Sequence, residues 1–127
     1  MSDEYVAILV KRFPAIKEVW LIGSRANESA RADSDWDYIV FADERTLSLL
    51  RCDESLRRPD IDVLMVFDGD SFEEPWPTAH RKKHGSLHGW GWRRLAMKKA
   101  VYRATKVKPD DEFNVTVASQ YARRVWP

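Results

Sequence analysis

One stretch of the chain, from Trp20 to Phe41, constrains the fold more than any other. It reads as a short apolar strand that stops at Gly23, a polar segment, and a second strand that begins at Asp35. A glycine turn that leads into a helix leaves backbone N–H groups free, and phosphate binds well there. The stretch therefore predicts two neighbouring strands joined through an anion-binding turn.

Two carboxylates, Asp35 and Asp37, mark the start of the second strand, which is expected to begin at Asp35 and continue through the β-prone residues Trp36 to Phe41. Side chains alternate across a strand, so these two are expected to point the same way. Like charges side by side repel and lose solvation unless a cation neutralises them, so the pair predicts oxygen ligands for a divalent metal. Two alternatives stay open: a pair formed by Asp33 and Asp35 in the loop, and a solvent-facing sheet edge without function.

A third carboxylate lies on the next strand, expected from about Asp60 to Phe67. Asp62 has apolar residues on both sides, so it is expected deeper in the sheet than Asp60. A buried aspartate needs a partner, and a metal shared with Asp35 and Asp37 would supply one. Asp60 is the second choice for this ligand, and a strand cap is its ordinary role.

The residues Gly23-Ser24, followed after a spacer by Asp35-Trp36-Asp37, resemble the signature of the DNA polymerase β-like nucleotidyltransferase superfamily. The fuller string GSRANESARADSDWD is most similar to the minimal nucleotidyltransferases, which are small stand-alone domains. The resemblance is specific from Trp20 to Asp37 and supported at Asp62, and nothing after Phe67 matches.

The resemblance implies an α+β fold of the two-layer nucleotidyltransferase type, with a mixed central sheet and helices packed mainly on one face. It implies transfer of NMP from an NTP, with ATP expected, to a hydroxyl acceptor on a protein, a nucleic acid or a small molecule. Three carboxylates would bind two Mg²⁺ ions, which Mn²⁺ can replace: Asp35, Asp37 and Asp62. Three turn residues would bind the nucleotide: Gly23, Ser24 and Arg25. In related bacterial systems a minimal nucleotidyltransferase is an antitoxin that modifies a HEPN toxin, so a second protein is an expected partner or acceptor.

Two other classes of function stay open. One is a nucleotidyltransferase-fold module that regulates a protein partner without catalysis. The other is a nucleic-acid-binding domain that uses Arg81–Lys83 and the tryptophans, with binding that falls with salt and needs no metal. His80, His84 and His88 recur every fourth residue, but the glycines between them argue against a helix that would align them on a metal.

Composition limits the remaining choices. The 127 residues fit one domain, with a motif core at 18–67 and a family-specific part at 68–127, and the net charge of +1 gives no overall attraction to nucleic acid or membrane. The one cysteine, Cys52, cannot form an internal disulfide, which favours a reducing cytosol. No apolar run can span a bilayer and the N-terminus lacks a signal-peptide core, so a cytoplasmic protein is expected.

Hydrophobic periodicity and turn residues predict the other elements. Helices are expected at 2–13, 24–31, 43–50 and 96–106, and strands at 18–22, 60–67, 90–95 and 113–117. Residues 118–125 are ambiguous and could be helical.

Overall fold

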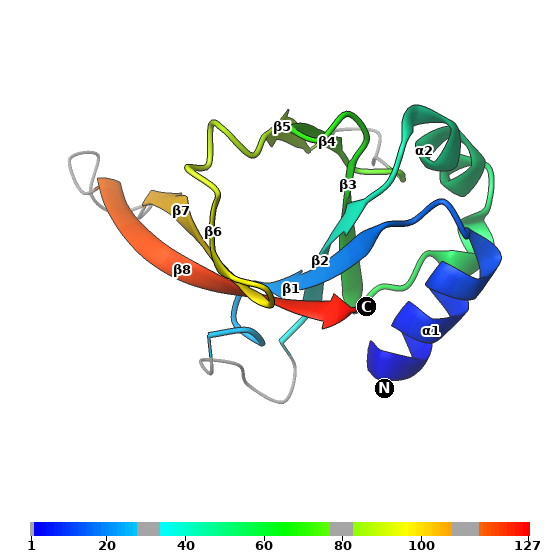
Figure 1. Cartoon of the computed structure of the whole chain (residues 1–127), viewed down its shortest axis with the longest axis horizontal. Helices are drawn as coiled ribbons and strands as arrows, with labels where there is room; N and C mark the ends of the chain where they lie inside the picture. Colours follow the sequence, from blue (N-terminus) through cyan, green and yellow to red (C-terminus); the bar gives the residue numbers. More distant parts are fainter. Residues whose placement is uncertain (1, 28–33, 77–82, 108–114) are drawn as a thin grey trace.

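The computed structural model describes residues 2–27, 34–76, 83–107 and 115–127 (Figure 1). Within these ranges the chain forms one mixed sheet of eight strands, two α-helices and a short 3₁₀ helix at Glu54–Leu56. The helices are α1 (Ser2–Arg12) and α2 (Glu44–Arg51). The strands are β1 (Glu18–Ile22), β2 (Trp36–Phe41), β3 (Ile61–Val66), β4 (Ser71–Glu73), β5 (His84–Ser86), β6 (Arg93–Ala96), β7 (Lys99–Val107) and β8 (Val115–Trp126).

The two helices form where local sequence signals predict them. Helix α1 ends just before Pro14, because the residue before a proline avoids the α region. Helix α2 begins after Asp43, whose carboxylate accepts a hydrogen bond from the backbone N–H of Thr46 at 2.8 Å. Leu47 and Leu50 of α2 are buried. Both helices are confirmed within a residue or two.

Strands β1, β2 and β3 form the centre of the sheet. β1 pairs antiparallel with β2, and β2 pairs parallel with β3 through the crossover that contains α2. The register places Asp37 beside Ile22 on one side and Asp62 on the other. All three strands were expected. β1 has the predicted bounds, and β2 begins at Trp36, one residue later than predicted.

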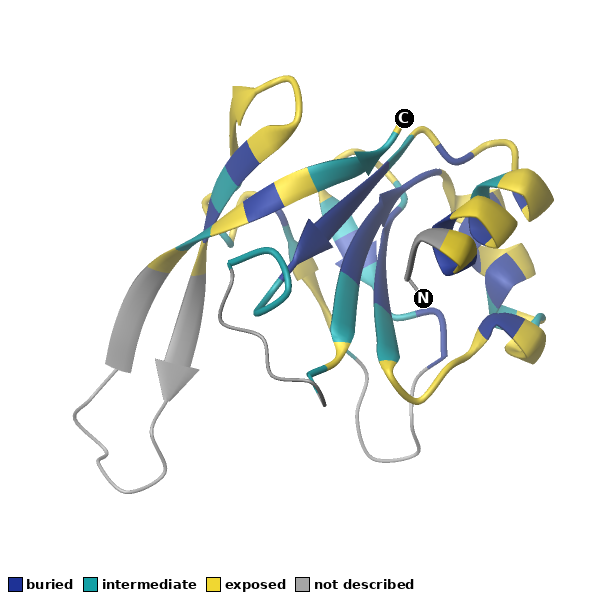
Figure 2. Cartoon of the chain, turned by 90° about the horizontal axis from the view of Figure 1, so that it is seen from below, coloured by how far each residue is buried: buried dark blue, intermediate teal, exposed yellow. Residues whose placement is uncertain are grey.

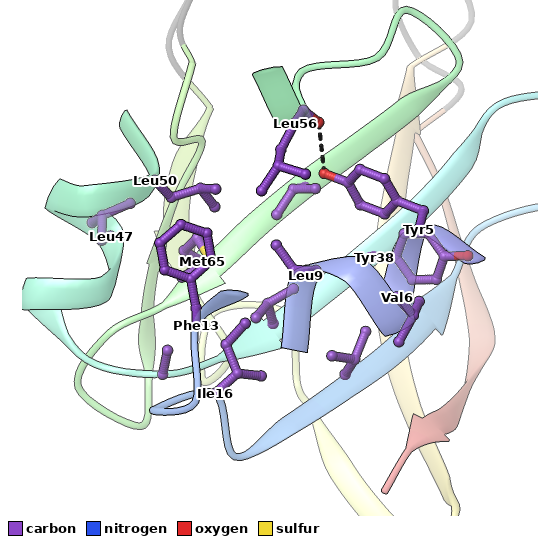
Figure 3. Packing of buried hydrophobic residues seen from close by; sticks show 14 of the residues in the cluster. Tyr5, Val6, Leu9, Phe13, Ile16, Tyr38, Leu47, Leu50, Leu56 and Met65 are labelled. Atoms are coloured by element: carbon purple, nitrogen blue, oxygen red, sulfur yellow. Dashed lines mark hydrogen bonds between the residues drawn. The ribbon is translucent and has the colours of Figure 1, made fainter. Parts of the chain in front are cut away.

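Side-chain alternation gives the sheet two separate hydrophobic clusters, one on each face. The first lies under α1 and α2, where Leu9 packs among strand residues such as Val40 and Met65 (Figure 3). In the same cluster the hydroxyl of Tyr5 donates a hydrogen bond to the backbone oxygen of Leu56 at 2.9 Å. The helices cover only this face of the central strands (Figure 2).

The second cluster lies on the opposite, concave face, because the sheet curls into a half-barrel (Figure 1). Trp20 and Ile39 of the central strands meet Tyr102 of β7 and Ala122 of β8 there. The sheet order is β5-β4-β3-β2-β1-β8-β7-β6, so β5 and β6, which are consecutive in the chain, lie at opposite edges. Residues 87–92 connect these two edges.

The expected mixed sheet with helices on one face is confirmed, but the rest of the expected architecture is not. After β3 the described chain is strands and turns, so the molecule is mostly sheet and not a helix-packed two-layer α/β structure. The helix predicted at 96–106 is wrong, since β7 runs along nearly all of it. The ambiguous segment 118–125 is part of β8.

Two smaller expectations also differ from the structure. The described part of the predicted 24–31 helix is a single turn, with Asn27 N donating to Gly23 O at 3.2 Å, and residues 28–31 lie outside the described ranges. Residues 90–92 form a turn with Gly91 at φ +64°, so the strand begins at Arg93. No helix among the described residues has the length and apolar character needed to cross a membrane.

Candidate functional site

A cavity of about 400 Å³ opens on the concave face, beside the ends of β1, β2 and β3. Its walls combine three kinds of residue. Carboxylates come from Asp37, Asp62 and Glu74, and basic side chains from Lys83 and His84. Its aromatic side chains include those of Phe72, Trp90 and Tyr102.

Asp37 and Asp62 form a carboxyl pair at one end of this cavity. They are directly opposite each other in the parallel register of β2 and β3, so their side chains lie next to each other on one face of the sheet. Burial, followed by the negative charge of Asp62, raises the pKa of Asp37 to about 6. Without a cation, this environment favours the protonated form of Asp37 more than water does.

Gly23 brings backbone against this pair. Its φ is +73°, and a Cβ at this position would lie 2.4 Å from Oδ2 of Asp37. Its N–H donates a hydrogen bond to the Tyr102 hydroxyl at 3.0 Å, and that hydroxyl donates to Oε1 of Gln120 at 3.0 Å. Only glycine fits both the dihedral angle and the space, so the predicted glycine turn does lie beside the predicted acidic pair.

The other predicted site residues are placed differently. Asp35 is exposed and precedes β2, outside the described cavity wall, although its charge contributes a small increase to the pKa of Asp37. Ser24 and Arg25 are also outside that wall. The Arg25 guanidinium lies 4.4 Å from the centroid of the Trp36 ring and donates to the backbone oxygen of Ser34 at 3.0 Å. The alternative loop ligand at position 33 lies outside the described residues.

Two of the three expected metal ligands lie next to each other in the cavity wall. Asp37 and Asp62 offer hard oxygen ligands, and a cation between them would remove the repulsion that raises the pKa of Asp37. Among the residues that the structure describes, no three His, Cys, Asp or Glu side chains are grouped so as to hold a metal. The residues therefore fit a divalent cation held by two carboxylates, with other ligands supplied by substrate or water.

The histidine series does not form a metal site. His84 belongs to β5 and lines the cavity, whereas His88 lies in the turn that follows β5. The two are not on one helix, and His80 falls outside the described ranges.

Several lining residues escaped the sequence analysis. The carboxylate of Glu74 accepts a hydrogen bond from the backbone N–H of Lys83 at 3.3 Å. Glu74 lies two residues after Phe72 in the sequence. In a strand this spacing places both side chains on the same face of the sheet, and it was the one local signal for Glu74. Trp90 lies with its ring centroid 4.8 Å from Phe72 and 5.5 Å from Tyr102, so these aromatics form a continuous wall.

Comparison with models of protein families, with curated proteins and with solved structures finds no match to this chain. The interpretation therefore depends on the cavity itself. Its acidic end carries two neighbouring carboxyl groups beside the backbone of Gly23, and its other walls include aromatic and basic residues.

Proposed function

We propose that this chain is a metal-dependent nucleotidyltransferase that transfers NMP from an NTP, with ATP expected, to a hydroxyl acceptor. The observation that carries the proposal is the Asp37–Asp62 pair, held against the Gly23 backbone at one end of an aromatic-lined cavity. The proposal treats β1–β3 with the two helices as the nucleotidyltransferase core. Strands β4–β8 are then an addition that closes the concave face.

Each residue of the cavity has a role in this proposal. Asp37 and Asp62 would hold Mg²⁺, with Asp35 approaching from the solvent side. The bound ion would supply charge neutralisation on the triphosphate and a lower pKa of the acceptor hydroxyl. Gly23 lets phosphate oxygens approach the backbone, because it has no side chain. Lys83 adds positive charge to the cavity wall.

The aromatic wall would contact the base. Trp90, the partly exposed ring of this wall, would stack on the base, while the buried rings of Phe72 and Tyr102 pack against Trp90 and support it. In this proposal the acidic end of the cavity would hold the metal and the phosphates, and the space beside the aromatic wall would hold the base.

One observation favours the second candidate, a silent binding module that regulates a protein partner. Ser24, Arg25 and Asp35 lie outside the described cavity wall, so two of the three expected nucleotide-binding side chains and one expected metal ligand are absent from it. A module of this kind would keep the cavity and bind nucleotide weakly or not at all.

The test is an NMR titration of the ¹⁵N-labelled protein with ATP, with and without Mg²⁺, followed by trace Mn²⁺. We expect Mg²⁺-dependent shifts at Gly23 and paramagnetic broadening around Asp37 and Asp62. Asp37→Asn should abolish both responses. Asp60→Asn is the matched control, because Asp60 is an exposed carboxylate just before β3 and outside the described cavity wall.

The outcomes separate the two candidates. Unchanged Mg-ATP binding in Asp37→Asn would overturn the site assignment. No response of the folded parent protein at millimolar ATP would overturn the enzyme proposal and favour the silent module. A positive response would lead to acceptor screening, with pyrophosphate release as the readout.

A further inference from the structure

The net charge of +1 conceals a strong separation of charge along the chain. Residues 34–76 contain twelve Asp or Glu and four Lys or Arg, whereas residues 83–107 contain seven Lys or Arg and no acidic residue. Residues 115–127 add two arginines and no acidic residue. The acidic positions 110–112 lie outside the described ranges. The described β5–β8 part is therefore basic, and the β2–β4 part is acidic.

The basic residues gather on the outer face of β6, β7 and β8. Ala100, Tyr102 and Ala122 point into the concave cluster, so their strand neighbours point outward. The pairing places Lys99 beside Arg123. The outer face thus carries five side chains in adjacent positions: Arg93, Lys99, Arg103, Tyr121 and Arg123.

This outer face has no helix over it. Helices α1 and α2 pack mainly on β1–β3, and they approach β8 at its C-terminal end, where Val125 and Trp126 pack against the helix-side cluster (Figures 1 and 2). Arg93, Lys99, Arg103 and Arg123 are exposed, and in the described structure none has a carboxylate within ion-pair distance. The nearby ion pairs, from Glu18 to Arg94 and Arg124, belong to the concave face.

An aromatic ring lies within this basic surface. Tyr121 is 47 % exposed, and Nζ of Lys99 lies 4.4 Å from its ring centroid. A groove of about 450 Å³ runs beside the ring and is lined by Lys98, Lys99 and Arg123. Cations on both sides of an exposed aromatic are the arrangement that holds a base and its flanking phosphates.

We infer that the outer face of β6–β8 binds single-stranded nucleic acid. Phosphates would contact Lys99, Arg123, Arg93 and Arg103, and one base would stack on Tyr121. Among the described residues these cations form no ion pair that phosphate would have to displace. The surface is an open sheet without a protruding helix for a duplex groove. Binding at this face needs neither a divalent metal nor the concave cavity, so it is independent of the proposed enzyme activity.

The test is fluorescence anisotropy with a labelled oligothymidylate of about twelve nucleotides, in EDTA. Affinity should fall at least tenfold between about 50 mM and 200 mM salt, because phosphate contacts release counterions. Lys99→Glu combined with Arg123→Glu should weaken binding more than about tenfold at low salt. Tyr121→Leu should weaken it about tenfold, and Tyr121→Phe should keep it, because stacking needs the ring but not the hydroxyl.

The matched control is Arg45→Glu with Arg57→Glu, which reverses the charge of two exposed arginines in the acidic part. It changes the net charge by the same amount as Lys99→Glu with Arg123→Glu. Equal loss in this control would overturn the assignment to the outer face. No binding by the folded parent at low salt would also overturn it. A parent protein that is a dimer, and that becomes a monomer in the Lys99→Glu, Arg123→Glu variant, would overturn it as well. The outer face would then bind the acidic part of a second copy. Asp37→Asn should bind the oligonucleotide like the parent.

Discussion

Burial and the negative charges of Asp62 and Asp35 all raise the pKa of Asp37 and so favour its protonated form. Lys83 opposes them, since its positive charge lowers the pKa, but the sum still leaves the pKa near 6. A group of this kind at the end of a cavity is a sensitive reporter of bound cations, because a cation reverses the sign of the local field.

The stability of the protein should therefore depend on pH through Asp37. Its pKa is about 6 when folded and near the ordinary 3.8 when unfolded, so its contribution is greatest below about pH 4 and is lost as pH rises through 6. At about pH 7 without metal, Asp37→Asn should be more stable than the parent. The shift from 3.8 to about 6 corresponds to roughly 3 kcal/mol at about 1.4 kcal/mol per pKa unit, and solvent screening of this half-buried carboxyl reduces the expected gain to about 1–2 kcal/mol. Urea unfolding across this pH range measures the difference, and parallel pH profiles would contradict the prediction.

Gly23 and Gly69 offer a matched test of crowding at the site. Both have positive φ, at +73° and +88°, but a Cβ would meet Asp37 only at Gly23, since nothing lies within 4 Å at Gly69. Gly69→Ala should cost about 1 kcal/mol of unfolding free energy, and Gly23→Ala at least twice as much. Thermal or urea unfolding provides the comparison. Equal costs would mean that the carboxyl moves aside freely.

At the scale of the elements, the turn after β1 is tied to the last strand by one side chain. Asn27 donates to the backbone oxygen of Tyr121 at 3.1 Å and accepts from its N–H at 2.8 Å. Its amide also donates to Gly23 O at 2.7 Å. The turn beside the carboxyl pair is thus held by β8, which follows it by more than ninety residues.

Asn27→Ala should loosen this connection without unfolding the sheet. We expect a loss of about 1–2 kcal/mol and faster hydrogen exchange at the amide of Tyr121, which loses its acceptor. The amide of Val40, in the central strand β2, should exchange as in the parent. Unchanged protection at Tyr121 would show that the strand pairing alone holds this end of β8.

Local patterns were sufficient for some elements and not for others. Strands β1 and β2 have apolar runs bounded by turn residues, and α2 has an N-cap, so neighbouring residues decide them. In 96–106, Met97, Ala100, Val101 and Ala104 follow a helical spacing, yet the segment pairs with β8 along nine residue pairs. That pairing is non-local, and it outweighs a helical pattern that has no face to bury.

The same reasoning applies to the site. Gly23, Asp37 and Asp62 come from adjacent strands of the central sheet, so the motif was enough to place them together. Tyr102 and Trp90 reach the cavity only because β8 and β7 follow β1 in the sheet order and the sheet is curled. No local signal encodes that order.

At the scale of the whole molecule, both hydrophobic clusters depend on one backbone. Val40 of β2 faces the helices, and its neighbour Ile39 faces the concave side. Unfolding of the central strands would therefore disrupt both hydrophobic clusters at once. The protein is expected to unfold in one cooperative step.

Leu9→Ala should test this. Leu9 is fully buried in the helix-side cluster, so its truncation should cost about 2–5 kcal/mol. Hydrogen exchange at the amide of Ala122, whose side chain is buried in the concave-side cluster, should speed up by the same free energy as exchange at the amide of Val40. Protection at Ala122 that stays at the parent level would show that the two faces unfold separately.

The short segment between β5 and β6 joins the two edges of the curled sheet covalently. Residues 87–92 join its two edge strands, and they are anchored at both ends: Leu87 N donates to Asp70 O at 2.8 Å and Arg103 N donates to Trp90 O at 2.7 Å. Fully extended, so short a link spans no more than about 25 Å. Chain length therefore sets an upper limit on how far the edges can separate. A bulky ligand must therefore enter the concave side along the axis of the half-barrel, because β5 and β6 cannot separate widely enough to admit it between them.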